Sequence, residues 1–346
     1  MRIPRDARAW GLPLALLYGA VVRLRNWAYD RGWRSSRPGA LHTLVLGNVT
    51  VGGTGKTPHA LYMVRALERI VGEGRVGVLS RGYGRRTRGF RWVSAEDAAT
   101  ATGDEPLLIK RHLGEVAVAV CEDRLAGLAA MRAQAPHLRW VVLDDALQHR
   151  RLRPDLALVL LDESQPVGLD FYLPCGRLRD TPRSLARADA ALLTRLPADA
   201  SPAMLAASLE RQGWPADRPH WGTTMHMRFP DLPQTPPRAI AVAGIAQPQR
   251  FLDALPGPFE LMASFTYPDH HPYSERDVRH WVQTAHHHRA SLLVTTEKDA
   301  MRIQPLSAVL HPLEMMTVGL EVQFFLAQTF QKWLEQKVTQ IEEGAR

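Results

Sequence analysis

A glycine-rich segment, TVGGTGKT at residues 50–57, constrains the fold of this chain more than any other feature. Gly55, Lys56 and Thr57 match the end of the phosphate-loop pattern GxxxxGK(S/T), while Thr50 stands where that pattern begins with glycine. The segment follows a short apolar run typical of a buried strand and precedes apolar residues at helical spacing. A strand, a glycine-rich turn and a helix in this order predict a P-loop in an α/β fold.

The loop predicts a binding site for the phosphates of a nucleotide and for Mg²⁺. Glycines at this spacing let backbone N–H groups turn toward phosphate oxygens, and the N-terminus of the following helix adds its positive end. Lys56 would reach the β- and γ-phosphates of ATP, and the Thr57 hydroxyl would help to hold Mg²⁺. The predicted phosphate-binding residues are Thr50, Val51, Gly52, Gly53, Thr54, Gly55, Lys56 and Thr57.

Short apolar runs alternate with helix-compatible stretches along the chain, which predicts a mostly parallel sheet with helices on both faces. Prolines are frequent between residues 197 and 238, so we expect a domain junction near residues 220–237. An amphipathic pattern over residues 324–341 predicts a closing helix. The predicted segments are an N-terminal helix segment 1–37, a P-loop core 38–225 and a smaller α/β domain 226–346. The predicted strands are 43–46, 76–79, 116–120, 140–143, 156–161, 190–193, 239–243, 292–295 and 315–318.

Two pairs of neighbouring carboxylates are candidates for catalysis. Asp144 and Asp145 end the apolar run that begins at Trp140, and ligands collect at the carboxyl ends of strands in open α/β sheets. Such a pair holds Mg²⁺ directly or through water in related sites, and the alternative is a solvated turn. Asp104 and Glu105 precede a helical stretch, where Asp104 would either cap the helix or accept the proton of an attacking hydroxyl.

Arginine and histidine clusters are candidates to complete such a site. The segment SRGYGR at residues 80–85 follows a predicted strand, and arginines there suit the recognition of phosphate. Arg177 and Arg179 form a second cluster, and the segment DHH at residues 269–271 would supply a histidine from the second domain. Taken alone, each cluster is more often a solvated surface feature.

The N-terminal segment combines apolar, aromatic and basic residues. Residues 10–22 form an apolar run that is too short to span a bilayer, which needs roughly 20 residues. The run lacks the small residues that end a cleaved signal peptide. The combination predicts a helix lying in a membrane interface, and the alternative is a first helix packed on the domain core. The flanking arginines are Arg2, Arg5, Arg8, Arg23, Arg25, Arg31, Arg34 and Arg37.

The charge balance narrows the choice of partner. A net charge of +8 suits nucleic acid, an anionic membrane or a phosphorylated substrate. The basic excess gathers in the N-terminal segment and not along a groove with interleaved aromatic residues, which argues against a nucleic-acid partner. The chain has only two cysteines, Cys121 and Cys175, so neither a disulfide framework nor a cysteine zinc site is expected.

Six motifs in a fixed order make the chain resemble a known family. The motifs are GNVTVGGTGKTP (47–58), SRGYGR (80–85), GDEP (103–106), DDALQHRRL (144–152), PDHHPY (268–273) and TTEKDAMR (295–302). Together they resemble the tetraacyldisaccharide 4'-kinase family of Gram-negative bacteria. The resemblance implies ATP- and Mg²⁺-dependent phosphorylation of the 4'-hydroxyl of a tetraacylated disaccharide 1-phosphate, which gives lipid IVA in lipid A biosynthesis. It also implies binding to the cytoplasmic face of the bacterial inner membrane through the N-terminal helix, and an active site between the two domains.

The resemblance further implies roles for single residues. Asp104 would be the base, paired with His270. Lys56 and Asp145 are also implied in catalysis, and Asp145 would contact either metal or substrate. The residues implied to hold Mg²⁺ are Thr57, Glu105 and Asp144. The residues implied in substrate binding or catalysis are Arg124, Gln148, His149, Arg177 and Arg179, with the choice between the last two open. Ala146 departs from the family, which commonly has glycine in DDGxQH, and we expect activity to survive a slight shift of that turn.

Two other classes of protein are alternatives to a kinase. A P-loop GTPase or metallochaperone would carry an NKxD guanine motif and prefer GTP, but TEKD at residues 296–299 lacks the residue between lysine and aspartate. A nucleic-acid-binding ATPase would bind generic DNA in a salt-dependent manner. The order of the six motifs favours the kinase.

Overall fold

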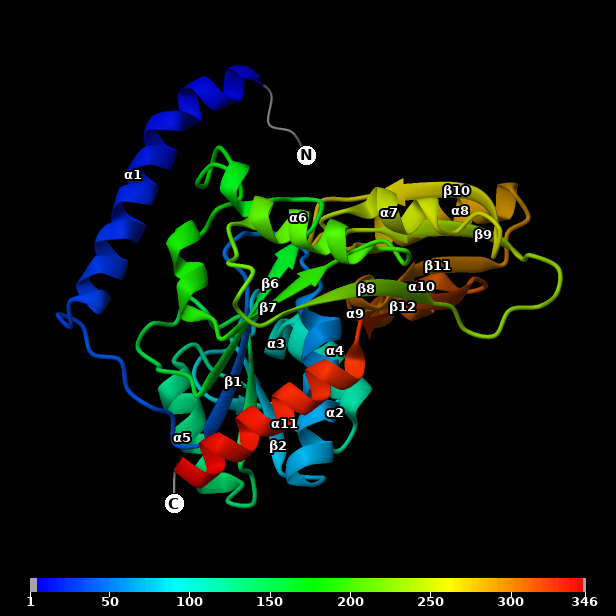
Figure 1. Cartoon of the computed structure of the whole chain (residues 1–346). Helices are drawn as coiled ribbons and strands as arrows, with labels where there is room; N and C mark the ends of the chain where they lie inside the picture. The colour runs from blue at the N-terminus through cyan, green and yellow to red at the C-terminus, as the bar shows by residue number, and fades with distance from the viewer. Residues whose placement is uncertain (1–4, 345–346) are drawn as a thin grey trace.

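One twelve-stranded sheet runs through the whole molecule (Figure 1). The computed structural model describes residues 5–344, with side chains from residue 11 onward except that of residue 169. From one edge to the other, the strands are β10 (Glu260–Thr266), β9 (Arg238–Ala243), β11 (Leu292–Thr296), β12 (Glu314–Phe324), β8 (His220–Arg228), β7 (Ala190–Thr194), β6 (Leu156–Asp162), β1 (His42–Gly47), β5 (Trp140–Asp144), β2 (Val76–Ser80), β4 (Ala117–Val120) and β3 (Arg91–Trp92). Every strand predicted from the sequence is present, and the mostly parallel α/β class is confirmed.

The P-loop half of the sheet extends from β7 to β3, and all its strands except β3 run parallel. Its central strands are apolar along their whole length because helices bury both of their faces. The helices on one face are α2 (Lys56–Val71), α4 (Asp104–Leu113) and α11 (Ala327–Gly344). The helices on the other face are α5 (Arg124–Gln134) and α6 (Pro202–Gln212). β1 lies at the centre of this half and leads directly into the P-loop.

The second half of the sheet consists of β9, β10, β11 and the first part of β12, which pair in parallel. Its helices are α7 (Pro248–Asp253), α8 (Glu275–His287) and α9 (Glu297–Ile303). α9 contacts α4 of the P-loop half, so the two halves meet through helices as well as strands. The short helical segments of the chain are α3 (Ala99–Thr102), η1 (Val167–Leu169), η2 (Pro182–Arg187), η3 (Gln304–Leu306) and α10 (Ser307–Leu310).

β8 and β12 join the two halves where the sequence predicts only a junction. The first residues of β8 pair in parallel with β7, and residues 223–228 pair antiparallel with the end of β12. The predicted boundary at residue 225 therefore falls inside a strand, and α11, which was predicted to belong to the smaller domain, packs on α2. The predicted start of the closing helix, at residue 324, is wrong, because Phe324 is the last residue of β12 and α11 begins at Ala327. The division into domains itself remains a prediction.

α1 (Arg5–Asp30) lies along one side of the P-loop half (Figure 1). Asn26 anchors it, because its Nδ2 donates to Asp180 Oδ1 at 2.7 Å. The outward apolar side chains, between 42% and 65% exposed, are Leu12, Leu14, Leu16, Leu17, Val21 and Leu24. No helix in the described part of the chain is long and apolar enough to cross a membrane. The structure does not describe the side chains of Arg2, Arg5 and Arg8, which precede the apolar run, or that of Trp10, which begins it.

Candidate active site

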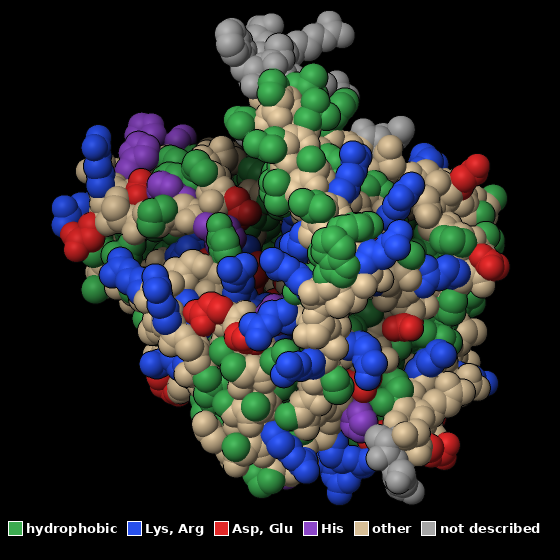
Figure 2. Space-filling model, turned by 90° about the vertical axis from the view of Figure 1, so that its left-hand side faces the viewer, with side chains coloured by type: hydrophobic (Ala, Val, Ile, Leu, Met, Phe, Trp, Pro, Cys, Tyr) green, Lys and Arg blue, Asp and Glu red, His purple; other side chains and the backbone are tan. Residues whose placement is uncertain are grey.

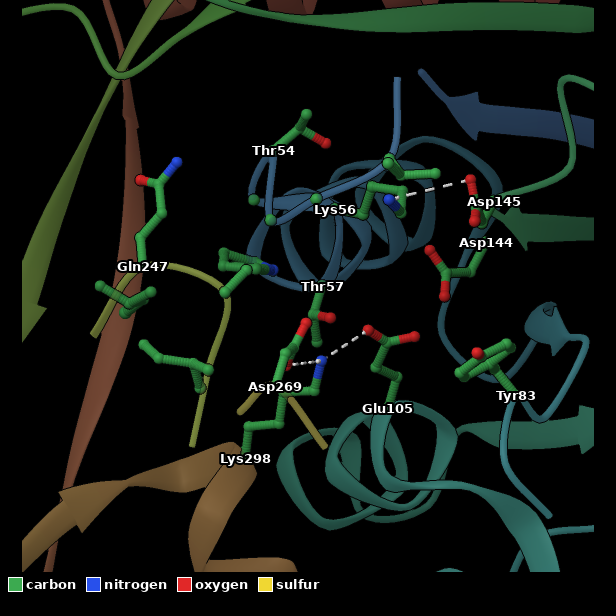
Figure 3. Close-up of a pocket in the computed structure, with 18 of the residues that line it drawn as sticks. Thr54, Lys56, Thr57, Tyr83, Glu105, Asp144, Asp145, Gln247, Asp269 and Lys298 are labelled. Atoms are coloured by element: carbon green, nitrogen blue, oxygen red, sulfur yellow. Dashed lines mark hydrogen bonds and ion pairs between the residues drawn. The ribbon is translucent and has the colours of Figure 1, made fainter. Parts of the chain in front are cut away.

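A cavity of about 1050 Å³ lies between the P-loop and the second half of the sheet (Figure 3), and residues of α1 also line it. The carboxyl ends of β1, β2 and β5 face it, as expected at the ligand-binding edge of a parallel sheet. Tyr18 and Arg25 line it from α1, Met225 from β8 and Gln247 from the loop before α7. All three predicted segments of the chain therefore contribute side chains to one cavity.

The backbone of the P-loop explains its glycine content. Gly55 precedes α2 with φ +82°, a conformation that side chains rarely adopt, and a Cβ there would lie 2.7 Å from Met225 Sδ. Thr50, in the place of the first glycine, is buried, and its backbone bridges to the loop that follows β6. Asn48 Nδ2 donates to Thr54 Oγ1 at 3.1 Å, which ties the beginning of the loop to its end. These contacts and the φ of Gly55 fix the shape of the loop.

Asp145 holds two cations at the phosphate end of the cavity. Lys56 Nζ lies 3.8 Å from Asp145 Oδ1, and the Arg179 guanidinium contacts both carboxylate oxygens as well as Asn48. Burial alone would raise the pKa of Asp145, but Lys56 and Arg179 outweigh burial and lower this pKa to about 2. In the turn that follows β5, Asp145 is the residue with a left-handed backbone, with φ 54°. Ala146 does not share that conformation, so alanine fits where the family commonly has glycine.

Asp144 has the environment of a metal ligand. It is 1% exposed, and its Oδ1 has no hydrogen-bond partner among the described residues. Burial, Glu105 and Asp145 raise the pKa of Asp144 to about 7. Figure 3 shows Thr57, Glu105 and Asp144 directed toward the same space. A divalent cation there would satisfy the buried oxygen and offset the repulsion between carboxylates, so the three predicted residues fit Mg²⁺.

The Mg²⁺ residues do not form a complete protein cage. Residues 5–344 contain no group of three or more histidine, cysteine or acidic side chains that is arranged to bind a metal. Mg²⁺ usually keeps several waters and takes its other ligands from one or two carboxylates and substrate phosphates. One hydroxyl and two carboxylates beside a P-loop are therefore a sufficient protein contribution.

Asp104 and His270 meet across the two halves of the sheet. Asp104 Oδ2 lies 3.2 Å from His270 Nδ1, which the loop between β10 and α8 contributes. Arg302 Nε, from α9, lies 3.3 Å from the same oxygen, and buried Asp299 holds Arg302 at 2.5 Å. The residue that caps α4 is Gly103, so the interpretation of Asp104 as a helix cap is wrong. The carboxylate is instead directed toward the second half of the molecule.

Lys298 is a site residue that the sequence reasoning missed. Its Nζ lies 3.1 Å from Glu105 Oε1, 3.2 Å from His270 Nε2 and 3.9 Å from Asp269 Oδ1 (Figure 3). Although burial works to lower it, Glu105 and Asp269 raise the pKa of the Lys298 ammonium. The sequence did contain one indication of this role. Lys298 comes just after a predicted strand, and side chains at the carboxyl end of a parallel strand face the ligand-binding edge of the sheet.

Arg195 is a second missed residue and connects the P-loop to the second half. Its guanidinium contacts the Gly53 carbonyl, Asp162 Oδ2 at 2.9 Å and Gln247 Oε1 at 2.6 Å. Apart from its position after a predicted strand, nothing in the local sequence distinguishes Arg195 from a surface arginine.

Four of the five predicted substrate-binding residues line the cavity: Arg124, Gln148, His149 and Arg179. Arg124 is buried at the start of α5 and donates to the main-chain carbonyl of Cys121 at 2.9 Å. Gln148 and His149 follow the turn after β5. Burial and the nearby Arg124 lower the pKa of His149 to about 4, so its ring is neutral at physiological pH. Gln148 lies next to α1, because Arg25 Nη2 donates to its main-chain carbonyl at 2.7 Å.

Two arginines from the predicted basic clusters point elsewhere. Arg177 Nε pairs with Asp170 Oδ2 at 2.8 Å, and Arg85 Nη2 pairs with Glu122 Oε1 at 2.6 Å. Neither arginine is among the described residues that line the cavity. Arg179 does line it, so the geometry favours Arg179 where the sequence left the choice open.

Comparisons with known proteins agree with the motif order. The model of the family described as tetraacyldisaccharide-1-P 4'-kinase matches residues 7–339. A tetraacyldisaccharide 4'-kinase of Cytophaga hutchinsonii is 36% identical over 303 residues, which cover 85% of either chain. One from Chlorobaculum parvum is 38% identical over 307 residues, covering 84% of this chain and 83% of the relative.

A solved structure shares the fold. It is described as the "apo" form of LpxK from Aquifex aeolicus in complex with ATP, and it superposes with a TM-score of 0.72. The two sequences are 24% identical, and the match covers 97% of this chain and 99% of the other. At this identity the likeness supports the fold. The family match over nearly the whole chain confirms the family predicted from the motifs: this chain belongs to the tetraacyldisaccharide-1-P 4'-kinase family.

Proposed function

We propose that this chain transfers the γ-phosphate of ATP to the 4'-hydroxyl of a tetraacylated disaccharide 1-phosphate, the step that gives lipid IVA in lipid A biosynthesis. The observation that carries the proposal is that His270 borders the same cleft as the P-loop and lies 3.2 Å from Asp104 Oδ2. Family membership indicates the acceptor. The Aquifex aeolicus relative described in complex with ATP supports ATP as the donor.

The nucleotide would bind with its phosphates at the N-terminus of α2. Backbone N–H groups of the P-loop and the Lys56 ammonium are suited to the β- and γ-phosphates. Asp145 keeps Lys56 and Arg179 together, so two cations are available to offset charge on the transferring phosphoryl group. The apolar residues suited to the purine ring are Met225, Met227, Ile245, Phe251 and Val318.

Thr57, Glu105 and Asp144 would hold Mg²⁺. Bound there, the ion would supply positive charge to the phosphate oxygens. Glu105 is paired with Lys298 at 3.1 Å in this structure, so part of its interaction with the ammonium would be exchanged for the metal. Asp144 would bind as the ionised carboxylate, which requires the loss of its proton.

Asp104 would act as the general base. The contacts with His270 and Arg302 are both made to Oδ2, so we assign Oδ1 to the proton of the 4'-hydroxyl. As that proton moves to Asp104, the hydroxyl oxygen forms a bond to the γ-phosphorus and the bond to the β-phosphate oxygen breaks, which releases ADP. Arg124, Gln148 and His149 lie where the lipid headgroup would approach from α1.

α1 would dock the enzyme on the cytoplasmic face of the inner membrane, where its lipid substrate resides. Figure 2 shows hydrophobic side chains along the projecting helix and Lys and Arg side chains around its base. Exposed leucines together with arginines are typical of a helix in the membrane interface. The helix also contributes Tyr18 and Arg25 to the cavity, so docking would bring the membrane surface to the active site.

The reaction is tested by transfer of label from γ-labelled ATP to tetraacyldisaccharide 1-phosphate in detergent micelles. We expect labelled bisphosphorylated lipid with the wild type and none with Lys56→Ala. Absence of transfer while the wild type still hydrolyses ATP or GTP would contradict the proposal and support a P-loop switch protein.

Membrane docking is tested with vesicles that contain anionic lipid. We expect Leu14→Glu/Leu17→Glu to weaken co-sedimentation at least about tenfold. Both leucines are exposed in this structure, and burying two such side chains in the bilayer would contribute roughly 3 kcal/mol or more. Met204→Glu, at an exposed apolar position of α6, is the matched control. Equal binding by all three proteins would show that α1 does not dock on the bilayer.

A further inference from the structure

Lys298 is placed so that a single ammonium contacts both ends of the catalytic arrangement. It is the second residue of α9, in the second half of the molecule, and its side chain is 22% exposed. Its Nζ reaches Glu105, a proposed metal ligand, and Nε2 of His270, the partner of the proposed base. Asp104 and Glu105 are neighbours in the first turn of α4. One side chain thus influences two adjacent carboxylates of the opposite half.

The charge of Lys298 determines what kind of contact it makes. Two carboxylates lie beside Lys298 Nζ, Glu105 Oε1 at 3.1 Å and Asp269 Oδ1 at 3.9 Å, and both favour the charged ammonium. A lysine ammonium has three N–H donors and no acceptor. The 3.2 Å contact between Lys298 Nζ and His270 Nε2 is therefore a hydrogen bond only if Nε2 is the acceptor.

This contact determines the tautomer of His270. A neutral imidazole carries its proton on one nitrogen, so a ring that accepts at Nε2 has its N–H at Nδ1. Nδ1 is the atom that lies 3.2 Å from Asp104 Oδ2, and its N–H then donates to the ionised carboxylate. The opposite tautomer would place a lone pair of Nδ1 against that carboxylate and an N–H of Nε2 against the ammonium.

The orientation of the ring is constrained in addition to its tautomer. His270 has a left-handed φ of 61°, and its backbone N–H donates to the Gly244 carbonyl at 3.2 Å. The Tyr83 ring lies with its centroid 5.6 Å from that of the imidazole. These contacts hold the ring in place, but both leave the position of the proton open. The ammonium of Lys298 beside Nε2 and the carboxylate of Asp104 beside Nδ1 together favour the Nδ1–H form, although Asp269 Oδ1 lies 3.9 Å from Nε2.

We propose that Lys298 is a positioning residue that holds His270 as the Nδ1–H tautomer, so that the ring donates to Asp104 and leaves the carboxylate able to accept a proton from the substrate hydroxyl. The proposal rests on the proposed role of Asp104 in phosphoryl transfer. It assigns Lys298 no contact with the reacting atoms. The pairing with Glu105 fixes where the ammonium lies, because the carboxylate attracts it toward α4.

The tautomer is measured directly by NMR of the nucleotide-free protein with ¹⁵N-labelled histidine, at about pH 8, where imidazoles are neutral. His270→Gln identifies the resonances of His270. We expect the wild type to show a protonated Nδ1 and an unprotonated Nε2. Lys298→Arg should keep that pattern because the guanidinium is also a donor only, whereas Lys298→Met should show a mixture of tautomers or the Nε2–H form. This readout does not depend on any enzymatic activity.

Kinetics provide the second readout. We expect Lys298→Met to lower kcat by about 10- to 100-fold, as loss of a residue that orients another commonly does, with little change in KM for ATP. Lys298→Arg should recover part of kcat. Lys332→Met, at an exposed lysine of α11, controls for the loss of a charge and should match the wild type.

Three results would overturn the proposal. A wild-type His270 with its proton on Nε2 would do so without any variant. Unchanged His270 resonances in Lys298→Met, or a kcat no lower than that of Lys332→Met, would do so as well. If the chain transfers no phosphate while the tautomer changes as expected, then the proposed function is wrong and the positioning of His270 by Lys298 still holds.

Discussion

The two halves of the sheet contribute to the cavity in different ways. The P-loop half supplies continuous segments, residues 50–57 and the two aspartates at the end of β5, Asp144 and Asp145. The second half supplies single side chains, His270 from the loop between β10 and α8 and Lys298 and Arg302 from α9. The phosphate end of the site is therefore encoded locally, whereas the base end exists only when α4 and α9 pack together. Binding of nucleotide and transfer of phosphate should be separable by mutation.

The largest expected effect separates these two ends. Asp104→Asn keeps the shape of the side chain but removes the proton acceptor, so we expect kcat to fall by about 10²- to 10⁴-fold. The dissociation constant for ATP should stay within about threefold of the wild type, because Asp104 lies on the base side of the cleft. Single-turnover transfer and nucleotide binding are the measurements. Near-normal turnover would remove Asp104 as the base, and a large loss of ATP affinity would show that the two ends are not separate.

The next effect tests the P-loop half through pH. The pKa of Asp144 is raised to about 7, so the folded protein favours the protonated form. The contribution of Asp144 to the free energy of unfolding is complete below pH 3.8, the ordinary pKa of the group, and is lost as the pH rises through about 7. Between these two values the loss is at most about 1.4 kcal/mol per pH unit. Without metal, the wild type should therefore lose stability relative to Asp144→Asn over this range. Denaturant unfolding in a chelator measures the difference.

Metal should reverse the direction of this pH dependence. Mg²⁺ binds the ionised carboxylate, so binding below the pKa of Asp144 releases a proton. Stabilisation of the wild type by Mg²⁺ and ATP should be greater at about pH 8 than at about pH 6, and Asp144→Asn should show little of this difference. Parallel curves for the two proteins, with and without metal, would mean that Asp144 is not a ligand.

The same contrast between the halves explains what the sequence can predict. The P-loop and Asp144 follow apolar runs that are strands on local pattern alone, so both their structure and their position at the sheet edge could be predicted. β8 could not, because it follows a proline-rich stretch and each of its two parts pairs with a different strand. Lys298 and Arg195 look like ordinary charged residues in the sequence, and only tertiary packing brings them to Glu105 and Gly53.

The smallest expected effect concerns two arginines that the sequence could not distinguish. Arg177 pairs with Asp170 outside the cavity, in a partly exposed ion pair worth at most about 1 kcal/mol, so Arg177→Gln should change kcat/KM about twofold or less. Arg179→Gln removes the cation that both oxygens of Asp145 contact, and should lower kcat/KM by about 10- to 100-fold. The two variants lose the same charge two residues apart, so each controls for the other. Equal losses would mean that both arginines reach the substrate and that the phosphate end of the site extends beyond the cavity seen here.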